Sequence, residues 1–330
     1  MSKSIAFIIC TERGNLEGMS VLFAKTLRTF GGALKEAPIY SYAPRAGKDI
    51  GHQTYKQFES LSVEHAYIPL NQEFKHYSVA NKVFALSYAE ATLNYDIIAF
   101  SDSDMFVLSE PAELLLSDDY DIALRPVGSK GIGISDPSDT EFEYWQKLYK
   151  ICGAEAISYV ETSIDSKKIY GYWNSGLMAA HRNKKIFAQW ELNLLKMLRN
   201  KIYPKNGLYF TEQSTFSATV MGTKARLLNL PKSYNYPIHR QETLPPAQKI
   251  DTLGEIVTAH YHDMFRKFES PTTPFPLLPF EKSDDYQYNW LIEHLNKYGV
   301  YSTDYFKRLY STMKGWTDHK RQRIQERIYF

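Results

Sequence analysis

The chain has 330 residues, a formal net charge of +2 and 44% hydrophobic residues, a composition typical of a folded protein with one large domain and room for an appendage. The small net charge gives no indication of a nucleic-acid partner, and the two cysteines, Cys10 and Cys152, lack metal-ligand spacing and are typical of a cytosolic protein. No apolar run approaches the roughly 20 residues that span a bilayer, and the run from Ile5 to Cys10 is too short for a signal peptide.

The amino-terminal part alternates short apolar runs with amphipathic stretches. These patterns predict strands at Ser4–Cys10, Pro38–Tyr42, His65–Leu70 and Ile97–Phe100, a helix from Leu16 that ends at Gly31-Gly32, and a helix capped by Ser78. Further along, the same reasoning predicts strands at Tyr120–Pro126, Leu177–Ala180, Ala225–Leu230 and Glu255–His260, and helices at Thr140–Ile151, Lys184–Arg199 and Thr211–Met221. This alternation predicts an α/β fold, a mainly parallel sheet with helices on both faces.

Two other segments have distinctive compositions. The segment Gly128–Asp139 contains three Gly and one Pro among Ser and Asp, which predicts a mobile loop and a candidate lid. The segment Pro271–Pro279 carries four prolines and predicts a strap that leaves the catalytic domain. We therefore expect a catalytic domain over residues 1–270, followed over residues 271–330 by this strap and a helical tail.

The end of that tail is basic. Between Lys307 and Phe330 there are seven Lys and Arg residues against two Asp and Glu, interleaved with aromatic residues and Ile. A solvated helix packed on the domain is the plainer interpretation. The alternative is a basic amphipathic surface that meets anionic lipid, which would place a cytoplasmic protein at the inner face of the membrane.

The strongest indication of a functional site is the pair of Asp residues after the apolar run Ile97–Phe100, which predicts a strand buried on both faces. Because successive side chains of a strand alternate, Asp102 and Asp104 project to the same side of its end. Two adjacent carboxylates repel each other, and a divalent cation relieves that repulsion. The carboxyl ends of strands are also where open α/β sheets bind ligands. We predict a metal-diphosphate site here; a solvated turn is the alternative.

Other polar groups fit this site. Lys82 begins the helix before the central strand and can reach phosphate or the two carboxylates. Asn174-Ser175-Gly176 combines hydrogen-bonding groups with a Gly that allows close backbone approach. Thr211 is placed to cap a helix whose first turn carries Glu212 and Gln213. Each of these features also has an ordinary structural interpretation: an exposed Lys, a turn and a helix cap.

His260 and His262 end the last predicted strand and point the same way along it. Either could complete the ligand shell begun by the two Asp, and the sequence leaves the choice open. Imidazole combined with carboxylates and diphosphate suits Mn²⁺ better than Mg²⁺, which prefers oxygen ligands alone.

The order of these motifs resembles that of GT-A fold glycosyltransferases, and most closely glycosyltransferase family 8, over about Ser4 to Arg266. The resemblance implies that Asp102, Asp104 and His260 (His262 as alternative) bind Mn²⁺ (or Mg²⁺), which holds the diphosphate of a nucleotide sugar. It places Ser103 at the ribose, Lys82 at the phosphates, and Asn174, Ser175 and Gly176 along the donor sugar. It also implies that Glu212 and Gln213 lie under the reacting sugar and that the base meets Cys10, Thr11 and Arg13.

The sequence departs from the family pattern at two motifs. Glu212-Gln213 stands where family 8 usually has Asp-Gln. The late motif reads His260-Tyr261-His262-Asp263 in place of His-x-x-Gly, and Arg266-Lys267 follows without the usual Pro-Trp. The chain therefore resembles a divergent relative, in which Arg266 or Lys267 is a candidate phosphate contact.

The predicted function is metal-dependent transfer of a hexose from a nucleoside-diphosphate sugar, with UDP as the expected nucleotide, to an acceptor hydroxyl of a glycan, glycolipid or protein. Similarity to family 8 implies retention of the anomeric configuration; an inverting enzyme would need Glu212 as its base. The alternatives are an Asp-x-Asp phosphohydrolase with Asp102 as nucleophile and a non-catalytic binding module for nucleotide sugar or carbohydrate. A sugar-nucleotide pyrophosphorylase is disfavoured, because Thr11–Asn15 contains one Gly and no basic glycine-rich loop.

Overall fold

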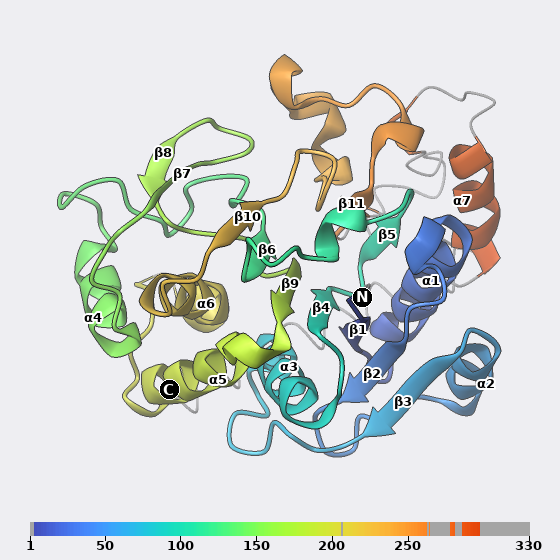
Figure 1. Ribbon diagram of the computed structural model, residues 1–330, viewed down its shortest axis with the longest axis horizontal. Coiled ribbons are helices and arrows are strands. Elements are labelled where there is room, and N and C mark those ends of the chain that lie inside the picture. The colour runs from blue at the N-terminus through green and yellow to red at the C-terminus, as the bar shows by residue number, and fades with distance from the viewer. Residues whose placement is uncertain (1–2, 206, 263, 265–277, 281–285, 298–330) are drawn as a thin grey trace, which may run out of the picture.

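The computed structural model describes residues 3–205, 207–262, 264, 278–280 and 286–297 (Figure 1). Its first half contains β1 (Ile5–Cys10), α1 (Asn15–Phe30), β2 (Ile39–Ala43), α2 (His52–Ser60), β3 (Val63–Tyr67), α3 (Asn81–Thr92), β4 (Ile97–Ser101), β5 (Met105–Val107) and β6 (Ile122–Leu124). Its second half contains α4 (Phe142–Cys152), β7 (Tyr159–Glu161), β8 (Lys168–Tyr170), β9 (Leu177–His181), α5 (Ile186–Arg199), α6 (Thr211–Gly222), β10 (Leu227–Asn229), β11 (Thr258–His260) and α7 (Tyr286–Lys297).

The centre of the molecule is a seven-stranded sheet with the order β10-β6-β9-β4-β1-β2-β3. All of its neighbouring pairs are parallel except those that involve β9, which runs antiparallel to β4 and to β6. The predicted mainly parallel α/β sheet is therefore confirmed. The reversed β9 matters for the site, because its first residues reach the same edge of the sheet as the last residues of β4 and β6.

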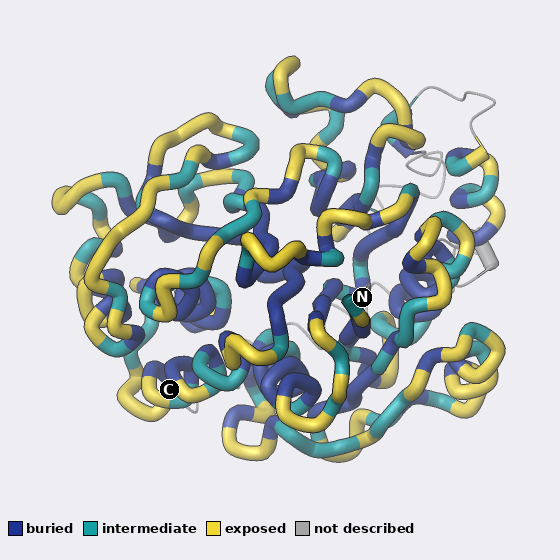
Figure 2. The backbone as a smooth tube through the Cα atoms, viewed as in Figure 1, coloured by how far each residue is buried: buried dark blue, intermediate teal, exposed yellow. Residues whose placement is uncertain are grey.

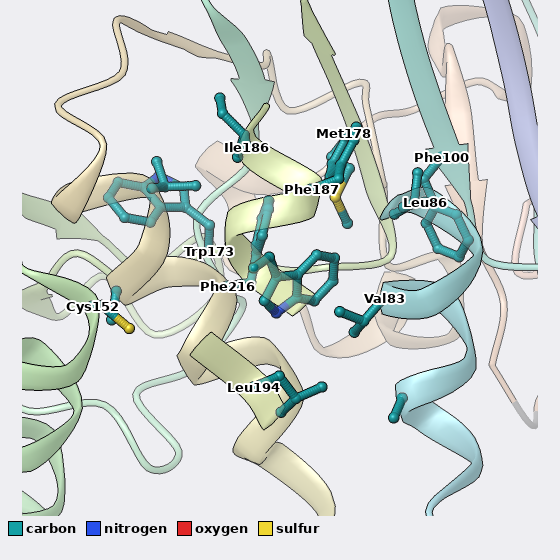
Figure 3. Packing of buried hydrophobic residues seen from close by; sticks show 14 of the residues in the cluster. Val83, Leu86, Phe100, Cys152, Trp173, Met178, Ile186, Phe187, Leu194 and Phe216 are labelled. Carbon is teal, nitrogen blue, oxygen red and sulfur yellow. The ribbon is translucent and has the colours of Figure 1, made fainter. Parts of the chain in front are cut away.

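Helices cover both faces of the sheet, as predicted. Alternate side chains of β1 divide between two cores: Phe7 packs with residues of α1, whereas Ile8 packs with residues of α3. Figure 3 shows the second core, in which α3, α5 and α6 contribute Val83, Leu86, Phe187, Leu194 and Phe216 against Phe100 and Met178 of the sheet. Figure 2 shows that the central strands are buried along their length while the surrounding loops carry the exposed surface.

The helix α7 confirms part of the predicted helical appendage. Tyr288, Leu291 and Leu295 are buried in a third core that also contains Leu22 of α1. The Trp290 ring lies 5.2 Å from the Phe30 ring, and Figure 1 shows α7 beside α1. Most of the predicted Pro271–Pro279 strap, the basic segment Lys307–Phe330, and Arg266 and Lys267 lie outside the described residues. Within the described residues, no helix is both long and apolar enough to cross a bilayer.

Several predicted boundaries are wrong for identifiable reasons. The strand expected at His65–Leu70 is Val63–Tyr67, and Pro69, which has no N–H to donate to a ladder, lies just beyond its end. Ser78 opens a 3-10 turn and α3 begins only at Asn81. Thr211 does not cap α6 but is its first residue. The helix α2 and the hairpin β7–β8 were not predicted.

The segment Gly128–Asp139 is held in the fold and is not the free loop that its composition suggests. Ile132 and Ile134 are buried in the core, and Trp145 Nε1 donates a hydrogen bond to the carbonyl of Ile132. The carboxylate of Asp139 accepts hydrogen bonds from the backbone N–H groups of Ser135 and Asp136. Two buried Ile side chains therefore anchor a stretch that is otherwise rich in Gly, Ser and Asp.

Candidate active site

The fold brings the predicted motifs to one edge of the sheet. Asp102 and Asp104 follow the end of β4, and Asn174-Ser175-Gly176 precedes the start of β9. Because β4 and β9 are antiparallel neighbours, with Ser101 opposite Leu177, these two segments meet. The N–H of Asp102 donates a 2.7 Å hydrogen bond to the carbonyl of Gly176.

A second small sheet brings the late histidines to this edge. β11 pairs antiparallel with β5, which places His260 opposite Met105, the residue that follows Asp104. His260 Nε2 lies 3.1 Å from Asp104 Oδ1, and His262 Nδ1 lies 3.8 Å from Asp104 Oδ2. The ligand atoms of Asp104, His260 and His262 all lie within 4.8 Å of one another. His260 and His262, the two alternative metal ligands expected from the sequence, therefore both face Asp104. We call these three residues the Asp104 cluster.

Asn235 fixes the orientation of His260. The N–H of Gly176 donates to Asn174 Oδ1 over 2.7 Å, which identifies that atom as oxygen, and Asn235 Nδ2 donates to the same oxygen over 2.8 Å. Asn235 Oδ1 then lies 3.0 Å from His260 Nδ1 and accepts a hydrogen bond from it. Asn235 thus holds Nδ1–H and leaves Nε2 directed at Asp104 Oδ1. With a cation between them, Nε2 would supply its lone pair, which is the tautomer that a metal-binding histidine requires. Asn235 has no counterpart among the site residues expected from the sequence.

The Asp104 cluster fits a divalent cation. Burial opposes ionisation of Asp104, but His260 and His262 outweigh it and lower the carboxyl pKa. Burial alone would lower the pKa of His260, but Asp104 outweighs that effect and raises it. One carboxylate and two imidazoles form a mixed oxygen and nitrogen donor set, which suits Mn²⁺ better than Mg²⁺.

Lys82 holds the first Asp of the motif. Its Nζ lies 2.8 Å from Asp102 Oδ1, 3.9 Å from Glu212 Oε1 and 3.3 Å from the carbonyl of Ser175. Burial alone would lower the pKa of Lys82, but Asp102 and Glu212 outweigh it and raise the pKa. Asp102 is therefore paired with a fixed ammonium group, whereas Asp104 faces the histidines.

Glu212 and Gln213 lie in the first turn of α6, beside this pair. Gln213 Nε2 donates to the hydroxyl of Tyr172 over 2.8 Å, and Gln213 Oε1 accepts from the N–H of Ser175 over 3.3 Å. Glu212 is 4% exposed, and its Oε1 accepts no hydrogen bond from any residue that the structure describes. Burial raises the pKa of the Glu212 carboxyl to about 7. The site thus holds a carboxyl that changes charge near neutral pH, next to an amide fixed by two hydrogen bonds.

Replacing Glu212 by Gln is expected to stabilise the protein. The pKa of the Glu212 carboxyl is about 7 in the folded protein, above its value in the unfolded chain. The folded state therefore binds the Glu212 proton more tightly, and the protein loses stability as the pH rises from the unfolded pKa to the folded pKa. The gain in unfolding free energy should grow from near zero around pH 4 to ~3 kcal/mol above pH 7. Urea unfolding at pH 5 and pH 8 measures it. An equal change in unfolding free energy at both pH values, or a loss of stability at pH 8, would contradict this prediction. The control is Glu73→Gln, which removes a carboxylate from a half-exposed surface ion pair.

Gly176 allows the elements of the site to approach closely. A Cβ atom at this position would lie 2.8 Å from Asp102 Oδ2, 2.9 Å from Asn174 Oδ1 and 3.0 Å from His260 Cε1. Each of these distances is too short for an unstrained contact. No side chain larger than hydrogen fits without moving groups of the site.

The variant Gly176→Ala should therefore lose stability by about 1–3 kcal/mol through overpacking. Because the displaced groups include a carboxylate and an imidazole of the site, we also expect weaker Mn²⁺ binding. Calorimetric titration of Mn²⁺ and thermal unfolding measure the two effects. Gly254→Ala is the matched control, since its nearest neighbour would be Gln287 Nε2 at 3.7 Å. Unchanged Mn²⁺ affinity in Gly176→Ala would show that the metal lies elsewhere.

The predicted nucleoside contacts lie at the end of β1. Ser103 Oγ donates to the carbonyl of Cys10 over 2.9 Å, and a chain of hydroxyl groups runs inward from Ser103 through Ser20 to Thr11. The Thr11 side chain is fully buried, so only its backbone can meet a base. Arg13 is exposed, and its Nε donates to the carbonyl of Asp49 over 3.0 Å. The roles of these residues at base and ribose stay predictions.

Two exposed aromatic rings lie at the start of α6 and were not predicted. Tyr209 is 59% exposed and Phe210 is 42% exposed, and their rings contact each other edge to face at 5.0 Å. The Tyr209 carbonyl accepts a hydrogen bond from the hydroxyl of Tyr77, which in turn accepts one from the N–H of Glu212. This connection fixes the backbone of the aromatic pair relative to Glu212.

Comparisons with known proteins place this arrangement in context. The sequence model of one protein family, described as the Rhodobacterales glycosyltransferase domain, matches residues 7–222. That span runs from β1 to the end of α6 and contains every residue of the site discussed above except Asn235, His260 and His262. No curated protein matches the sequence.

The chain is similar to several solved glycosyltransferase structures. The bifunctional glycosyltransferase WbbM shares 12% identity over 79% of this chain and 46% of its own, with a TM-score of 0.47. GlyE of Streptococcus pneumoniae TIGR4 shares 12% identity over 90% of this chain and 62% of its own, with a TM-score of 0.47. Mouse xyloside xylosyltransferase 1 shares 11% identity over 79% of this chain and 98% of its own, with a TM-score of 0.46. The chain thus spans less than two thirds of the length of WbbM and of GlyE.

Proposed function

Because this chain belongs to the Rhodobacterales glycosyltransferase domain family, we propose that it transfers a hexose from a nucleoside-diphosphate sugar, with UDP as the nucleotide, to an acceptor hydroxyl. The chain is a glycosyltransferase, so it uses a sugar donor and an acceptor. The observation that supports the finer proposal is the Asp104 cluster, whose ligand atoms all lie within 4.8 Å of one another. Lys82 of α3 contacts the neighbouring Asp102, and Gln213 of α6 contacts Ser175. The relationship to family 8 stays a prediction.

The Asp104 cluster would hold Mn²⁺. Bound there, the cation would neutralise and polarise the donor diphosphate as a Lewis acid. The Nδ1–H of His260, held by Asn235, keeps the imidazole lone pair directed to the cluster. Asp102 would add a carboxylate ligand for the cation, and its ion pair with Lys82 would keep that ammonium group beside the site.

Lys82 would stabilise the leaving group. Its ammonium lies between Asp102 and Glu212, and the raised pKa keeps it charged throughout the neutral range. As the bond between the anomeric carbon and the phosphate oxygen breaks, negative charge grows on the diphosphate, and a preorganised cation stabilises that charge. Because Lys82 is held by three contacts, it needs little reorganisation during the reaction.

We propose that the transfer proceeds with retention. The acceptor oxygen bonds to the anomeric carbon on the face that the phosphate leaves, and the acceptor proton passes to the departing phosphate oxygen. Gln213, fixed by Tyr172 and Ser175, would face the positive charge that develops on the sugar. An inverting reaction would instead pass the proton to Glu212, whose pKa of about 7 suits a base.

The test is turnover with a panel of nucleotide sugars. UDP-hexoses, GDP-hexoses and UDP-N-acetylhexosamines are incubated with the protein in Mn²⁺, Mg²⁺ or chelator, and release of nucleoside diphosphate is measured. We expect one UDP-sugar to turn over best in Mn²⁺. Proton NMR of the anomeric position then assigns retention or inversion. Tight donor binding without turnover, with any acceptor tried, would instead support the non-catalytic binding module.

The phosphohydrolase alternative lacks support. The matched family consists of glycosyltransferases. A trapped phosphoaspartate at Asp102 would revive this alternative.

A further inference from the structure

A cavity of about 210 Å³ opens beside the Asp104 cluster. It shares His260, His262 and Asn174 with the candidate active site. Its other walls include Arg125, just after β6, together with His239 and Arg240 from the segment that precedes β11. No residue described as lining it is acidic. We call it the Arg125 cavity.

Arg125 is a buried cation without an anion. It is 4% exposed, and its Nη1 donates to the carbonyls of Tyr234 and Asn235 over 2.7 and 2.8 Å. Among the described residues, no carboxylate pairs with it. Burial lowers its pKa to about 10, so it stays charged at neutral pH. Buried guanidinium groups usually have an anionic partner, because an unpaired buried charge is costly.

The other basic groups face the same space. Arg240 is exposed, and no described carboxylate forms an ion pair with it. The His239 ring packs edge to face against the His262 ring at 4.4 Å, which fixes it at the boundary between the cavity and the Asp104 cluster. Arg guanidinium groups recognise carboxylate and phosphate through paired N–H donors. The chemistry of the Arg125 cavity is therefore that of an anion-binding site.

The sheet order separates this cavity from the predicted nucleoside side. β4, which leads to Asp102 and Asp104, has β1 on one side and β9 followed by β6 on the other. The predicted base contacts Cys10 and Thr11 lie at the β1 side, and Arg125 lies at the β6 side. A donor whose diphosphate is at the Asp104 cluster and whose base is at β1 would meet this cavity only at the wall formed by Asn174, His260 and His262. Arg125 and Arg240 would then be left to the second substrate.

We propose that the Arg125 cavity binds a carboxylate or phosphate group of the acceptor, so that the enzyme selects acidic acceptors. This inference rests on the proposed function for the placement of the donor. The two acidic groups share the chemistry that Arg125 and Arg240 recognise, and they are distinguished by experiment. The anion would supply the partner that the buried Arg125 guanidinium lacks among the described residues.

The test is calorimetric titration of inorganic phosphate, and separately of glucuronate, into the full chain in buffer freed of divalent cations. We expect one of these two probes to bind, which identifies the acidic group. In Arg240→Gln the affinity should fall roughly tenfold, the usual effect of losing one charged hydrogen-bond donor. Arg199→Gln, which removes an exposed Arg paired with Glu73, should bind as the wild type does. Absence of binding of either probe, or equal binding in Arg240→Gln, would overturn the proposal.

A competition experiment separates acceptor from donor. The bound probe should persist when UDP and Mn²⁺ are added, because they occupy the Asp104 cluster and the β1 side. Displacement of the probe by UDP would assign the Arg125 cavity to the donor diphosphate and overturn the acceptor assignment. Donor hydrolysis by the wild type tests the proposed function independently, so an enzyme that hydrolyses donor but binds neither probe defeats this inference alone.

Discussion

Replacing Asp104 by Asn is expected to lower the rate of nucleoside diphosphate release by about 10²–10³-fold. The carboxylate lies against both histidines of the Asp104 cluster. Its loss would remove the anionic ligand of the proposed metal and leave two neutral imidazoles. The size of Asn keeps the packing intact, which makes the loss one of charge. Measurement of kcat at saturating Mn²⁺ and donor gives the effect.

The control for this variant is Asp118→Asn. Asp118 is 97% exposed and pairs with Lys3 at the opposite edge of the sheet, so its neutralisation should leave turnover unchanged. Mn²⁺ titration of Asp104→Asn should show weakened binding together with the loss of rate. Full activity in Asp104→Asn would remove the cluster from the mechanism, whatever the metal affinity.

Replacing Lys82 by Met should cost both stability and rate. Met keeps the apolar stem but leaves the Asp102 carboxylate and the buried Glu212 without their cation. Breaking a buried ion pair costs about 3–5 kcal/mol, and loss of a preorganised cation at the leaving group costs about 10²–10³-fold in kcat. Urea unfolding at pH 8 and donor hydrolysis measure the two effects.

A double variant tests whether the lost stability comes from the unpaired Glu212 carboxylate. Glu212→Gln combined with Lys82→Met should recover part of the lost stability at pH 8, because the unpaired buried charge is removed. It should not recover turnover. Lys224→Met, at a 75% exposed Lys, controls for loss of a surface charge. If Lys82→Met is as stable as the wild type at pH 8, the ammonium does not stabilise the two carboxylates.

The parts of the site that could be predicted from the sequence are those that a short local pattern of apolar and polar residues identifies. A buried apolar run that stops at Asp102 and Asp104 identifies a strand end with two carboxylates on one side. The same holds for His260 and His262, which follow an apolar stretch. Only the tertiary pairing of β5 with β11 shows that both histidines face Asp104. The sequence alone could not show this, because it depends on the register that places His260 opposite Met105.

Other groups leave no local signal. Asn235 sits in an ordinary Tyr-Asn-Tyr stretch, and its role depends on the distance to Asn174 and His260 across the fold. Arg125 appears in the sequence as an Arg at a strand end, and its burial is a consequence of the neighbouring strands and of the segment after β10. The helix α2 was missed because it buries only Thr54 and Phe58 and so lacks an apolar stripe.

The central claim is that a metal at the Asp104 cluster holds the donor diphosphate. The most direct test is titration of UDP into the protein with Mn²⁺ and after chelation, with free Mn²⁺ followed by electron paramagnetic resonance. We predict that UDP binds at least ~tenfold more tightly with Mn²⁺, and that UDP and Mn²⁺ are taken up together. Equal affinity for UDP with and without Mn²⁺, and no uptake of Mn²⁺ by the complex, would contradict the claim.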